Sequence, residues 1–260
     1  MYLAKRMAVT VFIVMLLSIS LKIDAALAEY QVNPYWFRII GGRPNNDIVV
    51  LKRVQEKRNS FYRSKLSIPV IHGTSDKELY EQLNDMFSQG IIHFDHEIEV
   101  NANRRLRDLA LSPEQSPYYI TEVDFQVNYN AGGLLSITVF FSHYTDKFNE
   151  MSFMETVNVD LTTGRAVEFY DLFATKQERN ALIKMINDQI RLNPTAYYID
   201  EIDPSYLEQI QSFYLMENHI VIYFDSNYLC PCSMGIPEFP FELSKAVREL
   251  RRADELVYQE

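Results

Sequence analysis

The chain has 260 residues and a formal net charge of −10, with 35 acidic and 25 basic side chains. Nucleic-acid phosphates are bound by clustered lysines and arginines, so this balance argues against a nucleic-acid partner. It favours encounter with a basic protein partner, although in most acidic secreted proteins the charge serves only solubility.

Residues 1–28 have the pattern of a signal peptide. Lys5 and Arg6 precede an apolar run from Met7 to Leu17, and Ala26-Leu27-Ala28 is a small-x-small cleavage site. Cleavage would remove three basic residues and one acidic residue and change the formal charge to −12. The alternative is a retained membrane anchor, but the run is shorter than the roughly 18 residues of a spanning helix. We expect an extracytoplasmic protein that is secreted, periplasmic or envelope-associated, with the membrane as a partner only if this segment is retained.

Cys230 and Cys232 are the two cysteines of the chain. A bridge between them would close a very small, strained ring, and paired zinc ligands usually have two or more residues between them. A mature chain of roughly 230 residues has room for a hydrophobic core, so it does not require disulfides. We expect two ordinary thiols or a local disulfide formed after export, without a metal.

The first half of the mature chain predicts two strands and a long helix. Residues 47–54 and 66–71 are strand-like and are joined by the charged stretch 55–65, whereas residues 29–44 are aromatic and irregular. A capping-box pattern begins at Ser75. Apolar residues then recur at spacings typical of an amphipathic helix, namely Leu79, Leu83, Met86, Phe87, Ile91, Phe94 and Ile98.

From residue 116 the apolar period changes to two, which predicts a β-meander. Its first hairpin turns at Asn130-Ala131-Gly132-Gly133 and its second at Thr162-Thr163-Gly164-Arg165. We expect the remaining elements to be helices at 175–192, 204–211 and 244–257 and a hairpin at 212–224. The predicted fold class is therefore α+β, an antiparallel sheet (β-meander) packed with helices. Two small subdomains are expected, residues 29–115 and 116–260.

Metal and triad chemistry receive little support from the sequence. His93 and His96 are spaced for a shared metal on the long helix, but a third ligand at a recognised distance is missing, and the polar flank of a helix explains them equally well. Ser142, His143 and Asp146 resemble a hydrolytic triad, but adjacent strand residues point to opposite faces. We expect no catalytic residue, metal or cofactor.

Carboxylates and exposed aromatic rings remain as candidate functional groups. Most carboxylates are expected to be solvated surface charge, but an acid/base pair is possible among Asp160, Asp171, Asp200, Glu201 and Asp203. Most tyrosine and phenylalanine rings are expected in the core. The rings predicted in loops are the expected ligand contacts, and these are Tyr144, Phe148, Tyr228 and Phe239.

The order of several short motifs resembles a bacterial extracytoplasmic domain family, DUF3298/DUF4163-like. That family forms the outer part of RsiV-type anti-sigma factors, which bind lysozyme, and a non-catalytic accessory part of some peptidoglycan deacetylases. The resemblance runs from about residue 66 to 241 and is carried by Ile68-Pro69-Val70-Ile71, Tyr129-Asn130, Leu134-Leu135-Ser136, Val159-Asp160-Leu161, Asp171-Leu172-Phe173, Phe213-Tyr214-Leu215 and Gly235-Ile236-Pro237-Glu238-Phe239.

The resemblance implies two α+β subdomains and makes Cys230-Pro231-Cys232 a local variant of a proline-stiffened loop. Two departures stand out. Residues 146–150 replace a glycine-rich stretch with a histidine that is common in the family, so lysozyme binding does not transfer directly. Only six residues precede the apolar run, so we expect no cytoplasmic sigma-binding segment. We also expect no deacetylase domain after the matched region.

These patterns predict an exported, non-catalytic binding domain of the cell envelope. Its expected partner is lysozyme or another basic protein, or cell-wall glycan (peptidoglycan), bound by residues 144–150 together with residues 228–239. The alternatives are an enzyme that acts on cell-wall glycan through paired carboxylates, and a structural envelope protein.

Overall fold

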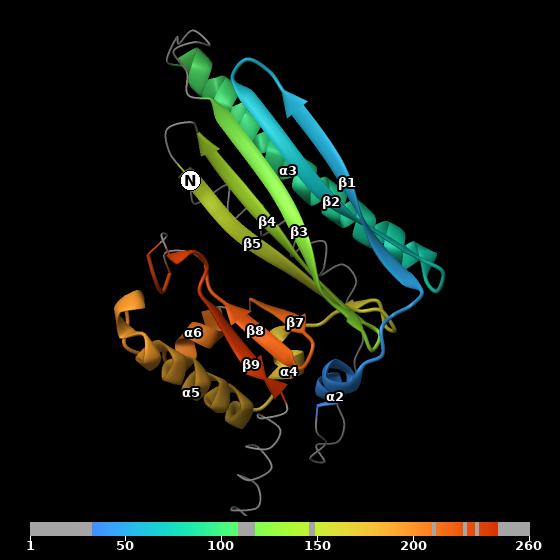
Figure 1. Ribbon diagram of the computed structural model, residues 1–260, viewed down its shortest axis with the longest axis vertical. Coiled ribbons are helices and arrows are strands. Elements are labelled where there is room, and N and C mark those ends of the chain that lie inside the picture. Colours follow the sequence, from blue (N-terminus) through green and yellow to red (C-terminus); the bar gives the residue numbers. More distant parts are fainter. Residues whose placement is uncertain are drawn as a thin grey trace, which may run out of the picture. The chain divides into compact units, whose positions relative to one another are not determined.

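Figure 1 shows the computed structural model, which describes residues 33–108, 118–145, 149–209, 212–225, 228–231 and 234–243. The predicted signal peptide and the predicted helix 244–257 lie outside these residues. Within the described ranges, no helix combines the length and the hydropathy that a membrane span requires.

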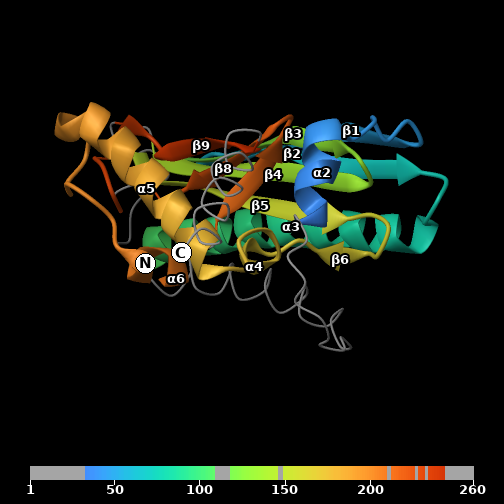
Figure 2. The same ribbon diagram turned by 90° about the horizontal axis from the view of Figure 1, so that it is seen from below.

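The strands form a six-stranded sheet in the order β1-β2-β3-β4-β5-β6 and a three-stranded sheet in the order β7-β8-β9. Helices pack on these sheets (Figures 1 and 2), so the α+β prediction is confirmed. The strands are β1 Ile48–Arg58, β2 Tyr62–Gly73, β3 Tyr119–Ala131, β4 Leu134–Thr145, β5 Asn149–Asp160, β6 Arg165–Ala166, β7 Phe213–Met216, β8 His219–Tyr223 and β9 Glu238–Glu242. The helices are α2 Pro34–Gly41, α3 Lys77–Asp108, α4 Phe169–Leu172, α5 Lys176–Leu192, the 3-10 turn η1 Pro194–Ala196 and α6 Pro204–Gln209.

Two compact units are built from segments that alternate along the chain. The first unit consists mainly of Asn46–Gln126 and Val139–Met154, and the second of Asp24–Asn45, Val127–Thr138 and Glu155–Glu260. Strands β3, β4 and β5 contribute residues to both. This division differs from the contiguous subdomains predicted from the sequence, because strand neighbours that are distant in sequence pack together.

In the first unit, β1 and β2 form a long antiparallel hairpin that includes most of the charged stretch 55–65. Strand β2 then pairs in parallel with β3, and α3 connects the two. Parallel neighbours require a crossover of this kind, since the chain must return to the same end of the sheet. The six-stranded sheet is therefore mixed, and this parallel pair was not predicted.

Helix α3 lies along one face of the strands of the first unit (Figures 1 and 2). Its buried side carries the apolar residues that the sequence predicted, from Leu79 to Phe94. The Leu79 N–H donates a hydrogen bond to Asp76 Oδ1 at 3.0 Å, so Asp76 caps the helix instead of Ser75. Phe94 meets Phe141 and Phe153 edge-on, with ring centroids 5.0 and 5.7 Å apart. These contacts attach the helix to β4 and β5.

The predicted glycine turn between β3 and β4 is confirmed. Gly132 and Gly133 have φ angles of 59° and 71°. A two-residue type I′ hairpin turn requires positive φ at both central positions, and glycine adopts this conformation without steric cost. The turn thereby fixes the register of the meander in this region.

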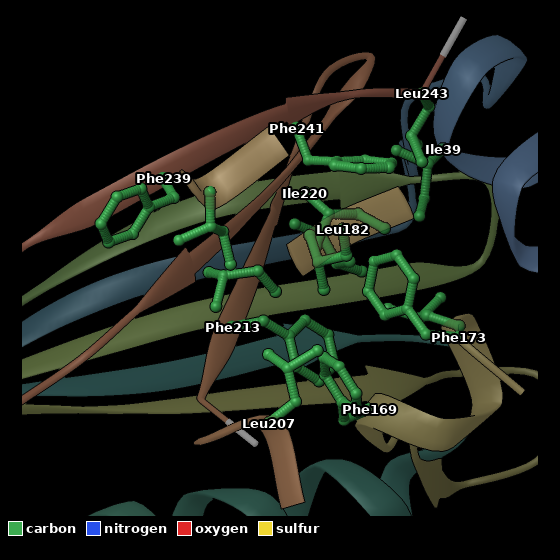
Figure 3. Close-up of a cluster of buried hydrophobic side chains, with 14 of the residues drawn as sticks. Ile39, Phe169, Phe173, Leu182, Leu207, Phe213, Ile220, Phe239, Phe241 and Leu243 are labelled. Atoms are coloured by element: carbon green, nitrogen blue, oxygen red, sulfur yellow. The ribbon is translucent and has the colours of Figure 1, made fainter. Parts of the chain in front are cut away.

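In the second unit, α5 and the three-stranded sheet enclose the cluster of apolar side chains in Figure 3. Helix α5 was predicted at 175–192, and Thr175 and Glu178 form a reciprocal capping box at its start. Helix α2, which was not predicted, adds buried Trp36 and Ile39 to this core. Its start at Asn33 and Pro34 follows the preference for Asn at the N-cap and Pro in the first turn.

Strand β9 lies in a segment that the sequence predicted to be a loop. It pairs with β8, so that Ile222 is opposite Phe239 and Ile220 is opposite Phe241. Pro240 obscured this strand in the sequence because proline cannot donate to a sheet ladder. An edge strand such as β9 tolerates proline, since one side of the strand has no neighbour in the sheet.

Candidate functional site

The four predicted contact residues occupy different environments. Phe239 belongs to β9 and is only 1% exposed, so the prediction that it lies in a loop is wrong. Side chains alternate along a strand, and this alternation turns both Phe239 and Phe241 into the core (Figure 3). Phe148 lies outside the described residues. Tyr144 belongs to the first unit and Tyr228 to the second.

Tyr228 is at the surface of the second unit and is 42% exposed. Its ring lies edge-on to Tyr206 at 5.8 Å and stacked on Phe224 at 6.3 Å between centroids. Its backbone N–H donates to Asp225 O at 3.1 Å. The ring is therefore held by a packed base while one part of it remains accessible to a ligand.

A second tyrosine segment lies beside this loop. The Tyr198 N–H donates to Leu229 O at 2.8 Å, and the ring of Tyr197 stacks on Phe239 at 5.9 Å. Tyr198 is 62% exposed, and Met234, in the same loop as Tyr228, is 55% exposed. We call four side chains of these neighbouring segments the tyrosine surface, which consists of Tyr198, Tyr206, Tyr228 and Met234.

Acidic residues are frequent in the segments that carry the tyrosine surface. From Leu192 to Ser244 the sequence contains eight acidic residues and neither lysine nor arginine. Four of the acidic side chains are exposed and belong to the same segments as the tyrosines, namely Asp200, Glu201, Asp203 and Asp225. This segment, which contains acidic residues but neither lysine nor arginine, is the pattern in the sequence that would have revealed the surface.

The loop that displays Tyr228 also holds Cys230, which is buried. Its Sγ lies 3.8 Å from Gly235 O. Burial, followed by the charge of a Cys230 thiolate, raises the pKa of Tyr197 above its usual value. Cys232 lies outside the described residues. Cys230 thus takes part in the packing of the loop base.

Tyr144 is half-buried on β4, so the prediction that it lies in a loop is wrong, and its neighbours are charged. Burial, and then the nearby carboxylate of Glu122, raise the pKa of Tyr144, while Arg63 opposes this shift. Close by, the Ser152 hydroxyl donates to Ser142 Oγ at 3.4 Å. Tyr144 is therefore a neutral hydroxyl in a polar part of the first unit, with a hydrogen bond to Glu122.

The carboxylates proposed for acid/base chemistry mostly serve local structure. Asp171 Oδ2 accepts a hydrogen bond from the Glu168 N–H at 2.8 Å, as part of a capping box. Asp203 Oδ1 accepts from the N–H and hydroxyl of Ser205, and these bonds lower the pKa of Asp203. Glu201 pairs with Arg191 at 3.2 Å.

Asp160, another of the five candidate carboxylates, forms an ion pair that the sequence did not reveal. Arg38 donates from Nη1 and Nη2 to its two carboxylate oxygens at 2.8 Å. Burial alone would raise the pKa of Asp160, but the hydrogen bonds from Arg38 and Thr162 outweigh burial and hold the pKa well below its usual value. Arg38 also donates to the carbonyl oxygens of Gly132 and Gly133. This Arg38 cluster ties α2 to two meander turns.

In the described part of the chain, the histidine pattern of α3 is not part of a metal-holding group, and two of the three triad-like residues are placed. Groups of three or more His, Cys, Asp or Glu side chains able to hold a metal are absent from it. His143 is buried, stacked on Tyr119 at 6.0 Å, with Nδ1 3.3 Å from Ile120 O. Asp146 lies outside the described residues.

Comparison with known proteins identifies two matching families and a shared fold. Residues 55–145 match a family model described as Deacetylase PdaC, and residues 170–244 match one described as a protein of unknown function (DUF3298). A DUF3298 family protein from Bacteroides fragilis has a similar crystal structure, with a TM-score of 0.55 and 14% identity, covering 78% of this chain and 93% of that chain. For one from Pseudomonas aeruginosa the values are 0.47, 13%, 76% and 92%. No curated protein matches the sequence.

The two family matches fall on different parts of the structure. The PdaC match covers the end of β1, the whole of β2 and α3, and the strands β3 and β4, whereas the DUF3298 match contains α5, α6 and the three-stranded sheet with the tyrosine surface. The resemblance inferred from the sequence motifs is confirmed, because residues 170–244 match the DUF3298 model and the preceding residues 55–145 match the PdaC model.

Proposed function

We propose that the protein is an extracytoplasmic, non-catalytic binding domain of the cell envelope, and that its tyrosine surface recognises a basic protein. The observation that carries this proposal is the combination of accessible tyrosine rings with a stretch of eight carboxylates free of lysine and arginine. Rigid aromatic side chains supply contact area at low entropic cost, and surrounding carboxylates attract and orient a cationic partner.

The non-catalytic assignment is supported by how the structure uses its carboxylates. Asp160, Asp171, Glu201 and Asp203 each hold a cap or an ion pair. Such groups are positioned to stabilise the fold, and their release for proton transfer would cost those contacts. The extracytoplasmic assignment is supported by the signal-like N-terminal sequence together with the two matched families.

Isothermal titration calorimetry with lysozyme as the basic probe tests the proposal. We expect Tyr228→Ala to weaken binding about tenfold, as expected for a central aromatic anchor, and we expect affinity to fall as salt rises. Tyr170→Ala is the matched control, because Tyr170 is a 40% exposed tyrosine of the same unit outside the tyrosine surface. Equal affinities for the two variants would remove this surface from the proposal.

Cell-wall glycan is the second candidate partner, and the accessible tyrosine rings favour it. Aromatic faces pack against sugar rings without needing charge, so glycan binding should depend on Tyr228 but respond weakly to salt. Substitution Asp200→Asn separates the two partners, since it should weaken lysozyme binding and leave glycan binding unchanged. Turnover of labelled peptidoglycan that is abolished by one carboxylate substitution would instead establish the enzymatic alternative.

Tyr144 remains a predicted contact of the first unit and is tested separately by Tyr144→Ala. Phe239→Ala does not serve as a binding test, because removal of this buried ring would damage the core of the second unit.

A further inference from the structure

One end of the first unit brings the turn between β1 and β2 next to the last turns of α3 (Figure 1). Asn59 Oδ1 accepts hydrogen bonds from the N–H groups of Phe61 and Tyr62 at 3.0 and 2.8 Å. Phe61 packs with Ile98 of α3 against the buried cluster of Tyr62, Ala102 and Tyr119. The turn is thereby fixed to the helix before any ligand arrives.

Basic side chains are concentrated at this end. Six exposed lysine and arginine residues lie on the hairpin beside the turn and on the last turns of α3, and we call them the basic tip: Lys57, Arg58, Arg63, Arg104, Arg105 and Arg107. Nearby carboxylates are fewer, and one of them, Glu99, pairs with Lys57. Because the whole chain carries a net charge of −10, this local excess of positive charge is opposite to the overall composition.

The hairpin contributes a like-charge pair to the basic tip. Arg58 of β1 is directly opposite Arg63 of β2 in the antiparallel register. Like charges in directly opposed positions destabilise a sheet, so the pair costs folding free energy unless an anion compensates it. Among the described residues, Arg58, Arg104 and Arg107 form no ion pair. The helix dipole accounts for arginines at the end of α3, but it does not account for the pair on the hairpin.

We propose that the basic tip binds a polyanion built of phosphodiester groups. Five of its six cations are arginine, whose planar guanidinium donates two parallel hydrogen bonds to phosphate oxygens. The cations are spread along a hairpin and a helix, where Arg104 and Arg107 are separated by about 4.5 Å along the axis, so several groups of one extended chain can be contacted together. Recognition at this tip is independent of the tyrosine surface.

A polymer fits the tip better than a lipid surface does. Peripheral membrane binding usually combines cations with apolar side chains that enter the interface. The aromatic residue of the turn, Phe61, packs towards α3 and Tyr62 instead of projecting from the tip. The accessible chemistry is therefore almost wholly cationic and hydrogen-bonding.

Calorimetric titration of the full chain with poly(glycerol phosphate) tests the proposal. We expect the triple variant Arg58→Ser, Arg104→Ser, Arg107→Ser to bind about tenfold more weakly at low salt. The slope of log K against log salt should become shallower by about 2, at about 0.7 for each lost phosphate contact. The control variant Arg165→Ser, Lys176→Ser, Lys184→Ser removes the same charge from exposed positions of the second unit and should keep the affinity and the slope.

Three outcomes would overturn the proposal. Equal losses in the two triple variants would show a response to net charge alone. Absence of polymer binding by the unmodified chain would exclude the ligand class. Binding to phosphatidylglycerol vesicles without binding to the polymer would reassign the tip to a membrane surface. All six substitutions are at exposed positions, so we expect every variant to fold. Circular dichroism checks this for each variant.

Discussion

The two units of the chain satisfy a buried carboxylate in different ways. The second unit places an ion pair, Arg38 with Asp160, in a site where the carboxylate side chain is only 4% exposed and fully hydrogen-bonded. In the first unit the donor to a buried carboxylate is a neutral phenol. The buried Tyr62 hydroxyl donates to Asp95 Oδ1 at 2.6 Å and lies 2.8 Å from Thr121 Oγ1. Charges with saturated hydrogen bonds therefore stabilise the fold, whereas exposed charges outside ion pairs are available to partners.

Among the changes that test this difference, Arg38→Met should lower the free energy of unfolding the most. It leaves the Asp160 carboxylate in its site without a cation, which typically costs about 3 kcal/mol of the free energy of unfolding. Trp36 is the single tryptophan of the chain and is buried in the second unit, so its fluorescence in urea reports the loss there.

The control for this substitution is Lys184→Met, which removes an exposed ion pair with Asp188 in the same unit. Exposed pairs contribute little, so a loss below about 0.5 kcal/mol is expected. If both variants lose the same free energy, the Arg38 cluster does not stabilise the second unit.

Low pH tests the contribution of the Asp160 carboxylate to the stability of the second unit. The pKa of Asp160 is lowered in the folded chain from its usual 3.8, so its stabilising contribution is complete above about pH 5 and is lost as pH falls towards the folded pKa. We expect the Trp36 transition in urea to move to lower denaturant as pH drops below 4, and to move less in Asp160→Asn. The shift should be smaller than that of Arg38→Met, because a protonated carboxyl still accepts a hydrogen bond from Arg38. Parallel pH profiles for the two proteins would contradict this assignment.

Tyr62→Phe tests the first unit and should have the smallest effect of the three. It leaves Asp95 and Thr121 buried without the phenol donor, at a cost of about 2 kcal/mol. Native-state hydrogen exchange of the α3 amides measures the loss within the first unit. Tyr118→Phe is the control, because the contacts of the Tyr118 hydroxyl to Asn59 O and Tyr62 O are both 3.4 Å long. An unchanged exchange rate in Tyr62→Phe would show that this network does not stabilise α3.

The candidate sites were only partly accessible from the sequence. Tyr228 was predicted as a contact and is exposed, whereas Phe239, chosen by the same reasoning, is in the core. The difference arises because Pro237 and Pro240 favoured a loop, while pairing with β8 makes residues 238–242 a strand. Tyr198 was missed because its place beside Tyr228 depends on a backbone hydrogen bond to Leu229.

The amino-acid sequence by itself determined the features that depend on neighbouring residues: the apolar face of α3, the glycine turn at Gly132 and Gly133, and the capping box of α5. Only the tertiary structure decided the parallel pairing of β2 with β3, the alternating segments of the two units and the union of Arg38 with Asp160, which are 122 residues apart. Local propensity acts over a few residues, whereas these features depend on which distant segments bury one another's apolar faces. That choice is made by the whole chain, so no short stretch of sequence reveals it.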